Sequence, residues 1–182
     1  MITNISKEEA MRRLKEGNTE FIGCSRNPGN VSPQIREETY VKGQHPYATV
    51  IACSDSREIP EAIFSCGIGE IFTIRVAGNV IAETQLASIE YAAEHLGVPI
   101  TVVLGHTNCG AVASACEGCE EGHIGVLTHD IQKAIGDEHD LILASRRNVL
   151  YQVAKIRNAF GKDFPVVGAL YHIESGVIDW LI

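Results

Sequence analysis

The sequence predicts an α/β fold, in which a mostly parallel sheet is covered by helices. Short apolar runs, typical of buried strands, occur at residues 47–52, 70–76, 100–104 and 165–170. Segments with helical spacing of their apolar residues lie between them, at 83–96, 124–135 and 141–160. Alternation of strands with helices is typical of a parallel sheet with both faces covered. A composition of 45% hydrophobic and 21% charged residues is that of a globular protein.

The beginning of the chain is predicted to form a helical arm outside the sheet. Ser6-Lys7-Glu8-Glu9 is a capping box that starts a helix, and Gly17 with Asn18 is expected to weaken or break that helix midway. Residues 23–46 are rich in Gly and Pro, so we expect a long, mostly irregular connection there. The 182 residues therefore form one domain, with an arm at 1–46 and an α/β core at 47–182.

The remaining elements complete the expected sheet. Pro60 suits the first turn of a short helix at 60–66, and Gly97 suits the C-cap of the helix at 83–96. Ser175-Gly176 is expected to turn the chain into a last short strand at 177–181. The predicted core is thus a four-stranded, mostly parallel sheet flanked by helices, with one extra C-terminal strand.

Charge and cysteine content exclude several classes of protein. The formal net charge is −8 and there is no basic block, so we expect no nucleic acid partner. There is no apolar run long enough to span a bilayer and no signal-peptide core, so we expect a cytoplasmic protein without a membrane partner. Six irregularly spaced cysteines in a reducing compartment are expected to be ligands or buried thiols.

Two polar motifs follow predicted strands, where parallel sheets bind their ligands. Cys53-Ser54-Asp55-Ser56-Arg57 follows the strand at 47–52, and His106-Thr107-Asn108-Cys109-Gly110 follows the strand at 100–104. Two thiolates and an imidazole form a Zn²⁺ ligand set with an open fourth position, and an adjacent carboxylate suits the generation of hydroxide. Taken singly, each signal is weak: Cys53 could be a buried thiol, and Asp55 with Arg57 could be a plain salt bridge.

Together the two motifs resemble those of the β-class carbonic anhydrases, as do segments 75–79, 87–92 and 167–171. The resemblance extends from about residue 40 to the C-terminus. It implies reversible hydration of carbon dioxide to bicarbonate and a proton, with one Zn²⁺ per chain bound by Cys53, His106 and Cys109. Zinc-bound hydroxide would attack CO₂, oriented by a catalytic dyad of Asp55 and Arg57.

The resemblance also implies substrate-binding residues and an assembly. Gln44 matches a substrate-holding glutamine, and Phe72 and Tyr91 match aromatic residues that line the pocket across a dimer interface. The backbone N–H of Gly110 is a further candidate donor to the substrate. The working unit would be a homodimer or a dimer of dimers (a homotetramer), with the first helix packed on the partner subunit.

A closed form of the family places Asp55 on the zinc. One branch couples that form to bicarbonate through an arginine and a tryptophan, the latter three residues before the first cysteine ligand. In this chain Arg75 is present, but Val50 occupies the position of the tryptophan, and the single tryptophan is Trp180. We therefore expect the open, water-bound arrangement at neutral pH. Two thiolate ligands leave the zinc site uncharged, so we also expect activity to rise with pH.

Other interpretations remain open. A family relative could hydrolyse a sulfur heteroallene such as carbonyl sulfide or carbon disulfide, and the fold could also carry a non-catalytic zinc-binding or thiol protein. Cys116-Glu117-Gly118-Cys119 could bind a second metal with His123 or His129, or be redox active, but a solvent-facing loop is the simpler interpretation. Cys24 and Cys66 are expected to be packed thiols.

Overall fold

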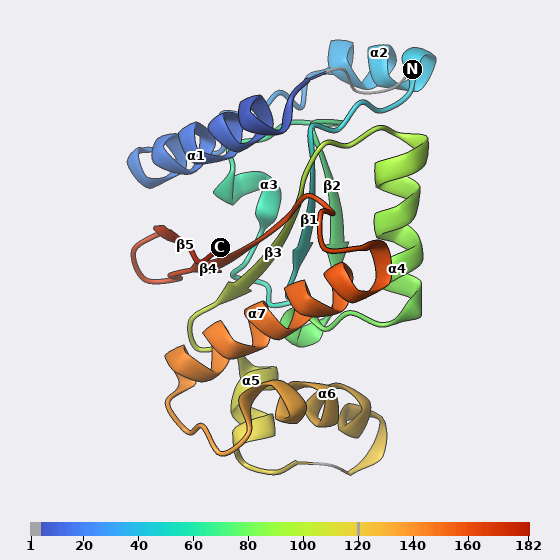
Figure 1. Cartoon of the computed structure of the whole chain (residues 1–182). Coiled ribbons are helices and arrows are strands. Elements are labelled where there is room, and N and C mark those ends of the chain that lie inside the picture. Colours follow the sequence, from blue (N-terminus) through green and yellow to red (C-terminus); the bar gives the residue numbers. More distant parts are fainter. Residues whose placement is uncertain (1–4, 120) are drawn as a thin grey trace.

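A five-stranded sheet forms the centre of the computed structural model, which describes residues 5–119 and 121–182 (Figure 1). The strand order is β2-β1-β3-β4-β5, in which β1 to β4 are parallel and β5 is antiparallel to β4. The strands are β1 (Ala48–Ala52), β2 (Ile71–Arg75), β3 (Thr101–His106), β4 (Val166–Tyr171) and β5 (Ile178–Trp180). The predicted mostly parallel α/β fold with an extra C-terminal strand is confirmed.

Helices cover both faces of the sheet. On one face, α1 (Lys7–Gly23) and α3 (Pro60–Ile63) pack on an apolar cluster that includes Leu14, Ile63 and Val102. On the other face, α4 (Glu83–Glu90) and α7 (Leu141–Phe160) pack on a cluster that includes Ile89, Val103 and Val153. All of these side chains are nearly inaccessible to water, so the hydrophobic effect holds the three layers together.

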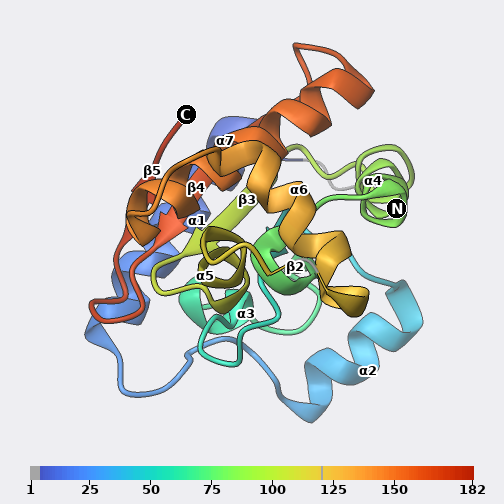
Figure 2. The same ribbon diagram turned by 90° about the horizontal axis from the view of Figure 1, so that it is seen from below.

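A third group of helices closes the carboxyl end of the sheet. Helices α5 (Gly110–Cys116) and α6 (Gly125–Ile135) lie below the strands in Figure 1 and in front of them in Figure 2. Their apolar residues Val112 and Ile131 form a buried cluster with Cys53 and Cys109. The short turns η1 (Ala77–Asn79), η2 (Tyr91–His95, a π-helical continuation of α4) and η3 (Gly122–Ile124) complete the fold.

The arm differs from its prediction in two respects. Helix α1 is continuous through Gly17 and Asn18, so the predicted break is wrong. The reason is tertiary: a Cβ on Gly17 would lie 2.0 Å from the carbonyl oxygen of Phe64, and the buried Asn18 amide donates to the carbonyl of Gly176 at 2.8 Å. These contacts outweigh the weak helix propensity of the two residues.

The connection at 23–46 is not mostly irregular, because it contains helix α2 (Pro33–Lys42). Ser32 caps it by accepting from the N–H of Ile35 at 3.3 Å, and Pro33 occupies its first turn. No residue of α2 is buried, and α2 lies at the end of the sheet opposite α5 and α6 (Figure 1). Helix α3 is also shorter than the predicted 60–66. Among the described residues, no helix is long and apolar enough to cross a membrane.

Gly17 should be indispensable for the packing of α1. Gly17→Ala adds a methyl group where the Phe64 carbonyl leaves no room, so we expect a loss of about 1–3 kcal/mol in the free energy of unfolding, despite the better helix propensity of alanine. Urea unfolding measures this loss. Gly23→Ala is the matched control on the same helix, since a Cβ there meets nothing within 4 Å. Equal stability of the two variants would contradict this account of the packing.

Candidate metal centre

The structure brings Cys53, His106 and Cys109 together at the carboxyl end of the sheet. Cys53 follows β1 directly, His106 is the last residue of the neighbouring strand β3, and Cys109 precedes α5. Their ligand atoms all lie within 4.8 Å of one another, and all three residues are buried. The parallel pairing of β1 with β3 therefore joins two motifs that are more than fifty residues apart in the chain.

The hydrogen bonding of His106 fits a metal ligand. Its Nδ1 lies 2.9 Å from the carbonyl oxygen of Thr107, which requires the proton on Nδ1 and leaves the lone pair on Nε2. Nε2 is buried and has no hydrogen-bond partner among the described residues. A buried imidazole nitrogen beside two thiols suits Zn²⁺, which prefers nitrogen and sulfur ligands in a tetrahedral arrangement.

The two cysteine sulfurs lie 4.0 Å apart in this pocket. The contact with Cys109 lowers the pKa of the Cys53 thiol, and the N–H of Gly78, which donates to its sulfur at 3.2 Å, acts in the same direction. For His106, burial alone would lower the pKa, but the Cys53 sulfur and the charge of Glu58 outweigh burial and raise it. The surroundings of Cys53 therefore favour its thiolate, which is the form of cysteine that binds metals.

Asp55 is held at the edge of this pocket by Arg57. The Asp55 carboxylate accepts from Nε of Arg57 at 2.9 Å and from its Nη2 at 2.7 Å, and Nη2 also donates to the carbonyl of Asn108 at 3.2 Å. The ion pair holds the pKa of Asp55 well below its usual range, so the group stays ionised. Oδ2 of Asp55 lies 3.9 Å from Nε2 of His106, beside the three ligand atoms.

Sequence reasoning missed the contacts that hold the Cys53 loop. Glu58 is fully buried and its carboxylate accepts from the Cys53 N–H at 2.8 Å, while burial raises the pKa of Glu58 to about 8. Arg75 donates to the carbonyls of Cys53 and Asp55 at 3.0 and 2.7 Å. The pairing of β1 with β2 could have indicated Arg75, because the last residue of β2 lies beside Ala52. No local sequence signal distinguishes Glu58 from an exposed glutamate.

The four expected substrate-binding residues lie at different distances from the candidate metal ligands. Gly110 adjoins Cys109 as the first residue of α5. Phe72 pairs with Thr49, four residues before Cys53, which corresponds to about 13 Å along the strand. Tyr91 is 46% exposed and its ring centre lies 6.1 Å from that of Phe72. Gln44 is exposed in the loop before β1. One chain therefore does not bring Gln44, Phe72 or Tyr91 to its own candidate metal ligands.

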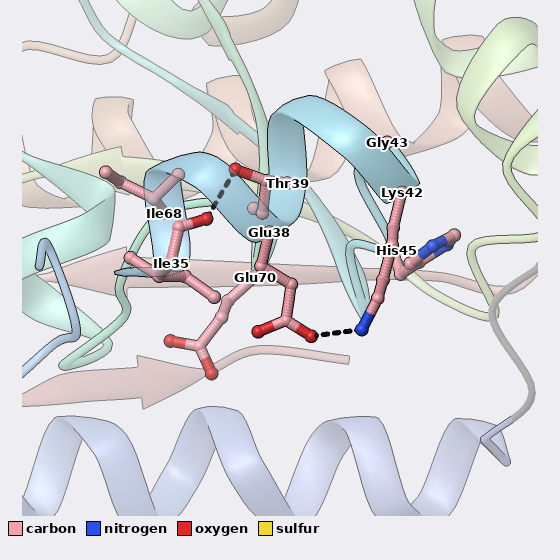
Figure 3. Close-up of a pocket in the computed structure, with 9 residues that line it drawn as sticks. Ile35, Glu38, Thr39, Lys42, Gly43, His45, Ile68 and Glu70 are labelled. Atoms are coloured by element: carbon pink, nitrogen blue, oxygen red, sulfur yellow. Dashed lines mark hydrogen bonds and ion pairs between the residues drawn. The ribbon is translucent and has the colours of Figure 1, made fainter. Parts of the chain in front are cut away.

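A cavity of about 190 Å³ lies at the amino end of β2, lined in part by Gly43 and His45, the two sequence neighbours of Gln44 (Figure 3). Residues of α2 and of the turn before β2 line it, including Ile35, Thr39 and Ile68. The Glu38 carboxylate points toward Lys42, with which it forms an ion pair at 2.7 Å, and the Glu70 carboxylate lies next to it (Figure 3). This cavity is at the opposite end of the strands from the candidate metal ligands.

The other cysteines form no comparable group. Among residues 5–119 and 121–182, Cys53, His106 and Cys109 are the one cluster with metal-ligand spacing. Cys116 is half-buried and contacts the carbonyl of Glu138 at 3.5 Å. Cys66 is buried against the hydroxyl of Tyr47 at 3.0 Å, and burial raises the pKa of its thiol to about 12. Cys24 is exposed, not packed as predicted, because it follows the end of α1.

Comparisons with known proteins agree with this geometry. A family model described as carbonic anhydrase matches residues 48–178. Carbonic anhydrase 2 of Mycobacterium tuberculosis is 37% identical over 95% of this chain and 92% of its own length. A carbonic anhydrase of Synechococcus elongatus is 31% identical over 92% of this chain and 70% of its own length. Among solved structures, a tetrameric β-carbonic anhydrase of Sordaria macrospora has a TM-score of 0.69, with 27% identity over 82% of this chain and 87% of its own. The β-carbonic anhydrase CcaA has a TM-score of 0.70, with 26% identity over 95% of this chain and 92% of its own.

Proposed function

The chain belongs to the β-class carbonic anhydrase family, and on this premise we propose that it catalyses the reversible hydration of carbon dioxide at a zinc ion bound by Cys53, His106 and Cys109. The observation that carries the proposal is the convergence of these three ligand atoms within 4.8 Å, beside an ionised aspartate. When bound there, zinc supplies the Lewis acidity that makes hydroxide available near neutral pH.

The residues around the pocket have separate roles. Arg57 holds Asp55 as a carboxylate, and Asp55 accepts a hydrogen bond from the attacking oxygen and directs its lone pair toward the carbon of CO₂. The N–H of Gly110 donates to a substrate oxygen as negative charge develops on it. We propose that Asp55 remains on Arg57 at neutral pH, which is the open form; the ion pair between the two side chains supports this.

Stopped-flow CO₂ hydration with a pH indicator, from pH 6.5 to 9, tests the proposal. The two thiolate ligands offset the double positive charge, so we expect a fast reaction whose rate climbs through this range. A buffer-level rate at every pH, with zinc confirmed in the protein, would contradict the proposed activity. Carbonyl sulfide and carbon disulfide would then be the next substrates to assay.

We further propose that two copies of the chain complete each active site. Gln44, Phe72 and Tyr91 lie away from the metal ligands of their own chain, and Gln44 lies next to α2, whose residues Tyr40 and Val41 are 89% and 73% exposed. Apolar exposure of this kind indicates a surface covered by a partner. A second copy packed on the arm (1–46) would bring these three residues to the other chain's pocket.

Co-expression of two inactive variants tests this arrangement. Asp55→Ala and Gln44→Ala each remove one residue of the site. In a mixed dimer with shared sites, one site keeps both residues, so random pairing should restore about a quarter of the wild-type activity. If each site used only its own chain, the mixture would show no more activity than the two variants measured separately. Isolation of the mixed dimer with two different affinity tags makes the comparison quantitative.

We also propose that the protein acts in the cytoplasm, because all six cysteines are free thiols and thiols persist in a reducing compartment.

A further inference from the structure

Glu58 is the one fully buried carboxylate in the loop that carries Cys53 and Asp55. Its exposed fraction is 0%. Oε2 accepts a hydrogen bond from the backbone N–H of Cys53 at 2.8 Å, and Oε1 is buried without a hydrogen-bond partner among the described residues. The single polar contact of this side chain is therefore with the main chain of a candidate zinc ligand.

The guanidinium of Arg75 holds the carbonyl groups of the same stretch of main chain. Arg75 donates to the carbonyls of Cys53 and Asp55, and the N–H of Glu58 itself donates to the Asp55 carbonyl at 3.0 Å. Glu58 and Arg75 thus bind the N–H and the carbonyl of the same residue, Cys53. The two hydrogen bonds from the Arg75 guanidinium are charge-assisted, and together with the hydrogen bond to Glu58 they limit the rotation of this stretch of main chain.

Local stability does not explain a carboxylate at this position. A buried acid with one unpartnered oxygen costs free energy, and this cost offsets what the side chain gains by satisfying the buried N–H of Cys53. The contribution of Glu58 must therefore lie in what its hydrogen bond does for Cys53. The direction of the Cys53 Cα–Cβ bond, and with it the position of the sulfur, depends on the main chain that Glu58 holds.

We propose that Glu58 is a positioning residue for the metal centre: by accepting the Cys53 N–H, it fixes the main chain so that the sulfur meets Cys109 and His106 at tetrahedral spacing. This inference rests on the zinc site proposed above. Partners one shell outside the ligands are known to alter metal affinity by about 10–100-fold.

Metal titration of Glu58→Met and Glu58→Gln tests the proposal. Methionine keeps the length of the side chain but removes the acceptor, whereas glutamine keeps an acceptor oxygen without the charge. In competition with a chromophoric chelator, we expect the Kd for Zn²⁺ to rise about 10–100-fold in Glu58→Met and to stay within about threefold in Glu58→Gln. The cobalt-loaded Glu58→Met protein should also show an altered thiolate-to-metal absorption band, restored in Glu58→Gln.

Unfolding of the metal-free proteins separates positioning from general damage. Metal-free Glu58→Met loses the acceptor of the buried Cys53 N–H but also the unpartnered oxygen, so we expect its melting temperature to fall no further than that of metal-free Asn18→Leu. Asn18→Leu is the control for destabilisation: it removes the buried amide that donates to Gly176, so it should lower the melting temperature and leave the Kd for Zn²⁺ unchanged.

Three outcomes would overturn the proposal. Unchanged zinc affinity in Glu58→Met would show that the hydrogen bond does not position Cys53. Equal loss in Glu58→Gln would assign the effect to charge instead of to the acceptor, and equal loss in Asn18→Leu would assign it to stability. None of these measurements uses CO₂ hydration, so a failure here is distinguishable from a failure of the proposed function.

Discussion

Asp55→Ala should lower kcat/KM for CO₂ hydration by about 10²–10⁴-fold and leave the zinc content unchanged. In the structure the Asp55 carboxylate is bound to Arg57 and lies beside the ligand atoms without joining them. Its removal therefore takes away the acceptor that orients the nucleophile but no metal ligand. Stopped-flow hydration together with zinc analysis by atomic absorption measures both quantities on the same sample.

Asp179→Ala is the matched control for this prediction. Asp179 also forms an ion pair with an arginine, Arg146, but it lies in β5, the C-terminal strand, and its side chain is 40% exposed. Exposed ion pairs contribute little to stability, so this variant should hydrate CO₂ at the wild-type rate. If Asp55→Ala kept a rate within threefold of the wild type, Asp55 and Arg57 would be a structural salt bridge at the end of β1.

Cys109→Ala should abolish both zinc binding and CO₂ hydration. Cys109 is 2% exposed and its sulfur lies 4.0 Å from that of Cys53, so its loss leaves two of the three ligands. Because a metal that binds only the folded state stabilises it, chelation should lower the melting temperature of the wild type and leave that of Cys109→Ala unchanged. Zinc analysis and calorimetry with and without chelator measure the two effects.

Cys66→Ala provides the comparison for Cys109→Ala. Cys66 is equally buried, at 2%, but it contacts Tyr47 on the α1 side of the sheet. Its removal should lower stability by leaving a small void and keep the full zinc content. Zinc loss in both variants would mean that any buried thiol supports the site through the fold, and would contradict the ligand assignment of Cys109.

The strands and the metal motifs were predictable because their signals are local. The apolar run before Cys53 and the one before His106 each specify a buried strand, and parallel strands end at the same edge of a sheet. The continuity of α1 through Gly17 was not predictable, since it depends on the Phe64 carbonyl, which is distant in the chain. Helix α2 did have a local signal, Ser32-Pro33 at its start, but the density of Gly and Pro in residues 23–46 outweighed it in the prediction.

The placement of polar residues was harder to predict than the fold. Glu58 follows Arg57 in a polar loop, where most glutamates face water, so its burial is visible only in the structure. Gln44 presents the opposite difficulty: its expected role needs a neighbouring chain, which a single sequence does not place. Arg75 was considered in relation to bicarbonate, whereas in the structure its guanidinium is engaged by the carbonyls of Cys53 and Asp55.

The parallel pairing of β1 with β3 also determines when the site can form during synthesis. Cys53 leaves the ribosome before His106 and Cys109, and translation of the 56 residues from Cys53 to Cys109 takes roughly 3–11 s at the usual rate of elongation. Parallel strands pair only after their crossover helix has formed, and such non-local contacts form late in folding. Until β3 pairs with β1, Cys53 is therefore a free thiol without the other two candidate ligands, and it is exposed to oxidants and to competing metals.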